Sequence, residues 1–218
     1  NIKLNLGVDV NKRLKTTLNL NYFSNERKSI NESGLGSVLF NAISYSPLFD
    51  LDQEDLNGLF GNEIINPLSQ IRDTYNSYSG SSIEGNFQLD YKLTDALKVT
   101  SRIGFKTYSD NGKTFSPIVN YGAGKVFNTT RSTVSQSRNQ YDSYTWDSFA
   151  TYKKLFADNH NVEATVGMTV IKNWGNGLSG TGYDVPYNSW DFADISQATG
   201  LGTGNDTSSY TYDNRLLS

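Results

Sequence analysis

The 218-residue sequence contains no cysteine, which excludes disulfide bonds and thiolate metal sites. It contains one histidine, His160, which lies in the predicted turn 158–161 with no candidate nucleophile beside it. A structural role in the turn is therefore favoured over a catalytic role. No catalytic, metal or cofactor motif with defined spacing stands out elsewhere, and we expect neither a bound cofactor nor enzymatic activity.

Long apolar runs and an excess of one charge are also missing. No run approaches the ~20 apolar residues that a membrane-spanning helix needs, so an α-helical membrane protein is excluded. The net charge is −3 with both signs mixed, and no basic cluster accompanies the aromatic residues, so nucleic-acid binding is not expected. The mean hydropathy of −0.52 remains compatible with strands in which only alternate residues face lipid.

What the sequence does contain is strict alternation of apolar and polar residues, in three pairs of stretches. Period two over about nine residues predicts strands with one apolar face. A short turn joins the members of each pair, whereas the long segments 25–82, 109–138 and 173–207 separate the pairs. Short turns at one end and long loops at the other are typical of transmembrane β-barrels. The expected strands lie near 2–10, 14–24, 83–92, 97–108, 140–153 and 161–172.

The two faces of these strands differ in chemistry. The apolar face carries no charge, whereas the intervening positions include Lys3, Asn19, Glu84, Arg102 and Asp147. A Lys or Arg side chain facing lipid at mid-membrane costs about 2–4 kcal/mol, so its exclusion from one face is expected in a barrel. The polar face would then line a wet lumen or contact a plug domain. Aromatic residues end the apolar stretches on both sides, as in interfacial girdles. They are Tyr22, Tyr91, Tyr144, Trp146 and Tyr152.

A soluble β-sandwich is the alternative interpretation, since its strands alternate equally well around a core. Such a domain would be a secreted or surface adhesin or a carbohydrate-binding module. It would place Leu4, Leu18, Phe87 and Val166 in one common core. Six strands and the start of a seventh near 210–217 fall below the roughly eight strands of the smallest barrels. We therefore expect residues 1–218 to be a partial β-barrel domain, with the plug domain and the remaining strands absent.

The long segments contain local signals of their own. Ser37 is expected to cap a short helix from residue 38, and Asn66 followed by Pro67 predicts a second helix start. The acidic residues of 50–55 resemble a calcium loop, but Asp55 and Gly61 occupy the places of its Gly and final Glu. A solvated acidic loop is favoured, and calcium binding is left open.

Aromatic residues and amides are concentrated in segment 173–207. We predict that Trp174, Tyr183 and Trp190 contact a substrate there, because flat rings beside amides can stack on and hydrogen-bond a polar ligand. The alternative is that these rings hold a long loop together.

Several of these segments resemble SusC/RagA-type TonB-dependent transporters. The resemblance lies in the loop sequence 66–68 with 72–75, the hairpin 89–98, the strands 144–168 and the strand opening at 214–218. It implies an outer-membrane barrel of a Gram-negative bacterium, with extracellular loops and outer-membrane lipid around it. It also implies a SusD-like surface lipoprotein as partner, energy delivered by TonB through the missing N-terminal part, and an oligosaccharide or peptide substrate.

Overall fold

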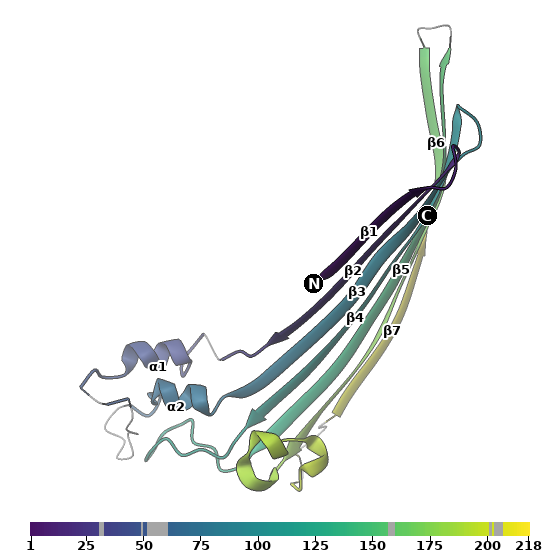
Figure 1. Cartoon of the computed structure of the whole chain (residues 1–218). Coiled ribbons are helices and arrows are strands. Elements are labelled where there is room, and N and C mark those ends of the chain that lie inside the picture. The colour runs from purple at the N-terminus through teal and green to yellow at the C-terminus, as the bar shows by residue number, and fades with distance from the viewer. Residues whose placement is uncertain (31–32, 49, 52–60, 157–159, 201, 203–206) are drawn as a thin grey trace.

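The computed structural model describes residues 1–30, 33–48, 50–51, 61–156, 160–200, 202 and 207–218. Seven strands form one antiparallel sheet in which each strand pairs with its neighbours in the sequence. The sheet is a long, bent ribbon that stays open, because β1 and β7 do not pair within the described residues (Figure 1). The predicted all-β antiparallel fold is confirmed. The strands are β1 (Ile2–Asp9), β2 (Leu14–Arg27), β3 (Tyr75–Lys92), β4 (Leu97–Ser116), β5 (Thr133–Phe156), β6 (His160–Tyr183) and β7 (Thr207–Leu217).

Two short helices stand at the end of the ribbon opposite the short turns (Figure 1). Helix α1 (Val38–Ser44) begins where the Oγ of Ser37 accepts a hydrogen bond from the backbone of Phe40. Helix α2 (Pro67–Arg72) begins where the Oδ1 of Asn66 accepts one from the backbone of Leu68. Both predicted helix starts are thus confirmed. No helix among the described residues has the length and apolarity to cross a membrane.

Three single turns of 3-10 helix lie at the same end of the ribbon (Figure 1). They are η1 (Pro186–Asn188), η2 (Trp190–Phe192) and η3 (Ile195–Gln197). Of the acidic run proposed as a possible calcium loop, 52–55 lies outside the described residues. His160 opens β6 opposite Phe156, and the turn 157–159 lies outside the described residues.

The register of the ladder aligns the apolar positions of neighbouring strands in rows across the sheet. One such row crosses six strands through Leu6, Leu18, Phe87, Ile103, Trp146 and Val170. The apolar band occupies nine residues in each of the strands β2 to β6, for example 83–91 in β3 and 144–152 in β5. Nine residues extend roughly 30 Å along a strand. This length matches a tilted strand crossing an apolar layer of about 25 Å.

No second sheet covers the apolar band within the described residues. Leu4, Phe87 and Val166 expose 43%, 41% and 75% of their surface, and Leu18 is half-buried. The buried hydrophobic residues belong instead to the long segments and to the strand ends beside them. The sandwich alternative, which required Leu4, Leu18, Phe87 and Val166 in one core, is therefore wrong for this fold. The buried hydrophobic residues are Val38, Tyr45, Ile65, Phe115, Tyr121, Val134, Val185 and Ala193.

Four strands are longer than the alternation predicts, and the extra length lies at the end opposite the short turns. Strand β3 begins at Tyr75 rather than near 83, β4 continues to Ser116, β5 begins at Thr133, and β6 continues to Tyr183. Most side chains on both faces of these extensions are polar, so the contrast that reveals a half-buried strand is absent. Their Gly, Ser and Asn residues predict loop, and that prediction is wrong for these extensions. These residues belong to the sheet because their backbones pair with those of the neighbouring strands.

A small core anchors the ends of these extensions. Phe115 and Val134 from adjacent strands pack with Val185 and Ala193 from the segment after β6. Tyr75, Trp190 and Ile195 are packed against them. The segments 109–138 and 173–207, predicted as loops, thus contribute strand and core as well as loop.

We predict that an arginine is tolerated on one face of β6 and not on the other. Val166→Arg places a charge in the uncovered apolar band, and in lipid this should destabilise the barrel by about 2–4 kcal/mol. Thr165→Arg places the same side chain on the polar face and should cost much less. The measurement is the folded fraction of the intact protein in outer membranes, followed by urea unfolding. Equal stability of both variants would contradict a lipid-covered band.

Candidate functional site: the polar face of the sheet

The charges on the polar face are arranged in cross-strand pairs. Lys98 of β4 lies 3.0 Å from the carboxylate of Asp90 in β3. Arg102 of β4 lies 2.6 Å from the carboxylate of Asp147 in β5, which also accepts a hydrogen bond of 2.9 Å from Thr169. Arg102 is directly opposite Asp147, whereas Lys98 lies diagonally from Asp90, and long side chains on one face of a sheet can pair in both arrangements. The face is therefore strongly polar with locally balanced charge.

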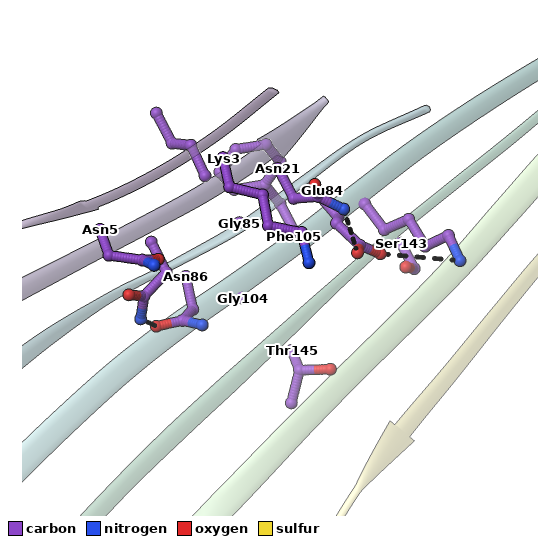
Figure 2. A pocket seen from close by; sticks show the side chains of 13 residues that line it. Lys3, Asn5, Asn21, Glu84, Gly85, Asn86, Gly104, Phe105, Ser143 and Thr145 are labelled. Carbon is purple, nitrogen blue, oxygen red and sulfur yellow. Dashed lines mark hydrogen bonds and ion pairs between the residues drawn. The ribbon is translucent and has the colours of Figure 1, made fainter. Parts of the chain in front are cut away.

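A shallow hollow of ≈ 560 Å³ lies on this face across β1 to β5. Its floor includes Gly104 of β4, which is opposite Asn86 on one side and Thr145 on the other. A Cβ atom at Gly104 would meet only two backbone oxygens, at 3.8 and 3.9 Å, so the space above it is open. The missing side chain creates the depression between neighbouring amides (Figure 2).

Amides and charged groups line the hollow and bond to one another across strands. The Nδ2 of Asn19 donates to the Oδ1 of Asn86 at 3.0 Å, and the Nδ2 of Asn21 donates to Glu84 at 2.9 Å. Lys106 lies 3.9 Å from the same Glu84 carboxylate. These groups offer donors and acceptors to water or to a polar surface laid against them. Within the described residues no cluster of three or more His, Asp or Glu side chains is placed to hold a metal ion.

Trp174, predicted to lie in a binding loop, lies within strand β6. It is opposite Asp142 of β5 and belongs to the face that carries the apolar band. Its ring meets Tyr144 edge-on at 6.2 Å, and the Nζ of Lys172 lies 5.3 Å from its centre. The placement in a loop is wrong. An aromatic ring just beyond the end of the band corresponds to an interfacial position.

Tyr183 is the last residue of β6 and is on the opposite, polar face. The guanidinium of Arg131 lies 4.4 Å above its ring. Nine residues of strand separate it from Trp174, which corresponds to roughly 30 Å. The structure therefore does not bring these two predicted residues together.

Trp190 lies in η2, in the segment after β6 as predicted. Its ring stacks on Tyr75 at 6.0 Å with an angle of 17° between the planes. The Nζ of Lys113 lies 4.1 Å from the ring centre and donates to the Trp190 carbonyl at 3.4 Å. These contacts anchor the loop on β3 and β4. Ligand contact by Trp174, Tyr183 and Trp190 stays a prediction.

Asp194 fixes the turn η3 to the sheet. Its carboxylate accepts hydrogen bonds from the backbone and hydroxyl of Ser196, at 2.9 and 2.7 Å, and from Gln136 of β5 at 3.0 Å. Hydrogen bonds to the charged form favour it over the protonated form. The hydroxyl of Ser196 is the largest cause, and together these donors lower the pKa of Asp194 to about 2.

Comparison with known proteins gives similarity at the level of the fold. No family model and no curated protein matches this sequence. Among solved structures, the RagAB peptide importer in its open-open state has a TM-score of 0.79 at 15% identity, covering 99% of this chain and 24% of that chain. The structure described as the RagAB peptide transporter gives the same values. The closed-closed state gives a TM-score of 0.76 at 16% identity. This chain spans about a quarter of the length of the chains that it resembles.

We predict a pH-dependent attachment of η3 that follows Asp194. The folded pKa is depressed, so the stabilisation is complete above the unfolded value near 4 and is lost as pH falls towards 2. Asp194→Ala should increase amide exchange over 194–198 at neutral pH. The difference from wild type should shrink between pH 4 and pH 2. Asp191→Ala, at an exposed position nearby, is the control, and an effect as large as that of Asp194→Ala would contradict the prediction.

Proposed function

We propose that this chain is part of the barrel wall of an outer-membrane transporter that imports oligosaccharides or peptides. The observation that carries the proposal is the division of one open sheet into an uncovered apolar band and a face of amides and ion pairs. Lipid would cover the first face, and the second would meet a water-filled lumen or a plug domain. The likeness to the RagAB peptide importer over 99% of the chain supports this assignment.

The orientation of the wall follows from the positions of the turns. Barrels of this kind place short turns in the periplasm and long connections outside the cell. The helices α1 and α2, the turns η1 to η3 and the strand extensions then stand on the extracellular side. We propose that a SusD-like surface lipoprotein docks on this end. TonB would act through a plug domain that is not part of residues 1–218.

The chemistry of the polar face supports import rather than catalysis. Charged side chains on this face form ion pairs with one another, as Arg102 does with Asp147. The amides around the hollow bond in pairs, such as Asn19 with Asn86. Such groups keep a surface wet and charge-balanced, as the wall of a transport lumen requires. We therefore assign the chain a transport role and no catalytic step.

Single cysteines test the membrane topology, because residues 1–218 contain no cysteine of their own. The intact protein, with any cysteine elsewhere replaced, would carry one substitution at a time and meet a membrane-impermeant maleimide on whole cells. Leu39→Cys in α1 should react at once, since Leu39 is 60% exposed at the long-loop end. Lys12→Cys in the first short turn should react only after the outer membrane is permeabilised. Val166→Cys should react in neither state.

Uptake tests the transport role separately. Cells that carry the intact gene would be given labelled oligosaccharides and labelled peptides, in backgrounds with and without TonB. Uptake that needs both the gene and TonB is the expected result. Reaction of Lys12→Cys on intact cells would overturn the topology. Uptake of no oligosaccharide or peptide, or uptake without TonB, would overturn the transport assignment.

A further inference from the structure

Five tyrosines lie together on the polar face, beyond the end of the apolar band. Tyr108 is opposite Tyr141, and Tyr141 is opposite Gly175, which in turn is opposite Tyr212. The others lie within four residues of this row along the strands. The group, called the tyrosine surface below, consists of Tyr78, Tyr108, Tyr141, Tyr210 and Tyr212.

Glycines in neighbouring strands lie beneath these rings. A Cβ atom at Gly177 would come within 2.3 Å of a ring carbon of Tyr210. One at Gly175 would come within 2.6 Å of the ring of Tyr212. Both glycines are buried although they are in a sheet with no layer packed on this face. The tyrosine rings themselves cover the glycines. Any other residue at these two positions would carry a Cβ atom in the space that the rings occupy.

The hydroxyl of Tyr210 shows how far its ring leans across the sheet. It lies 2.7 Å from the hydroxyl of Tyr141 and 3.2 Å from the Oδ1 of Asn139. Both partners are in β5, whereas Tyr210 is in β7. Strands that are two apart are separated by about 9.6 Å. The ring therefore lies along the sheet instead of standing upright from it.

The rings adjoin one another and leave part of their surface open. The ring centres of Tyr108 and Tyr141 are 6.0 Å apart with 21° between the planes, and those of Tyr141 and Tyr210 are 6.5 Å apart. Tyr78, Tyr210 and Tyr212 expose about two fifths of their surface, at 39%, 41% and 41%. Tyr108, Tyr141 and Tyr210 thus form a run of adjoining rings on a face that is otherwise polar.

Hydrogen-bonding groups border these rings. A second hollow of ≈ 360 Å³ is lined by Tyr108, Tyr141 and Tyr212 together with Lys106, Ser143 and Asn173. On the far side the Nδ2 of Asn139 donates to Asp110 at 3.0 Å. Amides, hydroxyls and charges of both signs surround the rings, among them Lys106 beside Glu84 and Asp110 beside Asn139.

We propose that the tyrosine surface binds the flat faces of pyranose rings and that the imported ligand is a neutral oligosaccharide; this rests on the proposed function. The axial C–H groups of a sugar pack on an exposed aromatic face, while its equatorial hydroxyls reach polar groups at the edge. Lys106, Ser143 and Asn173 stand at that edge. The flat tyrosine rings match the flat faces of the sugar, and the polar border matches its hydroxyl groups. The balanced charge around the rings matches a ligand with no net charge.

A peptide fits the same surface less well. Peptides bind sheets mainly by adding a strand to a free edge or by placing side chains in pockets. Strands β3, β4 and β5, which carry three of the five tyrosines, are paired on both edges. The rings form a floor rather than deep apolar pockets. Peptide binding is therefore the competing outcome of the test.

The test is binding to the purified intact transporter by calorimetry. The ligands are neutral α-glucan, β-glucan, mannan and fructan oligosaccharides and a mixture of short peptides. At least one oligosaccharide should bind. Tyr141→Ala and Tyr212→Ala should each weaken that binding by about tenfold, since each removes one stacking ring. Tyr141→Phe keeps the ring and should bind nearly as wild type does.

A pair of glycine variants separates ring position from loss of the tyrosine. Gly177→Val substitutes no tyrosine, but its side chain displaces the ring of Tyr210. It should therefore weaken binding as the Tyr→Ala variants do. Gly7→Val, on the same face of β1 with no atom within 4 Å of its Cβ position, should have no effect. Tyr91→Ala is the matched tyrosine control, 41% exposed but on the apolar face.

The outcomes assign each failure to one proposal. Peptide binding alone, or oligosaccharide binding that the Tyr→Ala variants leave unchanged, overturns the tyrosine surface while leaving transport intact. Binding of no oligosaccharide overturns it as well. The proposal is supported if the Tyr→Ala variants bind the oligosaccharide more weakly and Tyr141→Phe binds it as wild type does. If Tyr141 acted only through the hydrogen bonds of its hydroxyl, Tyr141→Phe would also lose affinity. The transport role itself is decided by the uptake and labelling experiments.

Discussion

The backbone register of the antiparallel ladder is the constraint on which this structure depends. Side chains alternate between faces with period two, so a slip of one residue in any pair would exchange its apolar and polar sets. The observed register places Leu18 opposite both Leu6 and Phe87, and the same alignment continues to Val170. The ion pairs on the other face, such as Arg102 with Asp147, form only in that register. One alignment therefore fixes both faces at once.

Sequence predicted the part of the fold in which one face is apolar. In the band, apolar and polar residues alternate from Ile83 to Tyr91 and from Tyr144 to Tyr152 with no charge at the apolar positions, and this pattern predicts the strands there. The extensions were missed because water reaches both faces and no side chain has to avoid it. What makes residues 133–139 a strand is the neighbouring backbone, which a linear pattern does not display. Helix starts at Ser37 and Asn66 were predictable because the capping group lies within a few residues of the backbone that it caps.

The alternation of apolar and polar residues also predicts part of the candidate site. The polar positions Lys3, Asn19 and Glu84 follow from alternation alone, and they line the hollow. Gly104 carried no recognisable signal, since its effect depends on neighbours from two other strands. The prediction of a loop at Trp174 is wrong because β6 has no contrast between an apolar and a polar face beyond residue 172. The tyrosine surface is equally hidden, because the glycines that make room for Tyr210 and Tyr212 lie on the neighbouring strand β6 and not beside them in the sequence.

The extensions of β5 and β6 have a mechanical consequence. Eleven residues of β5, 133–143, stand beyond the band, which is about 36 Å of strand. Ladders on both edges join this length to its neighbours, and the pairing continues without a break from residue 143 into the band, so the extension is one stiff panel continuous with the band. A tilt of such a panel by about 5° would carry its tip through about 3 Å over this length. A small change in the tilt of the strands in the band would therefore be enlarged to ångström scale at the small core around Phe115 and Ala193.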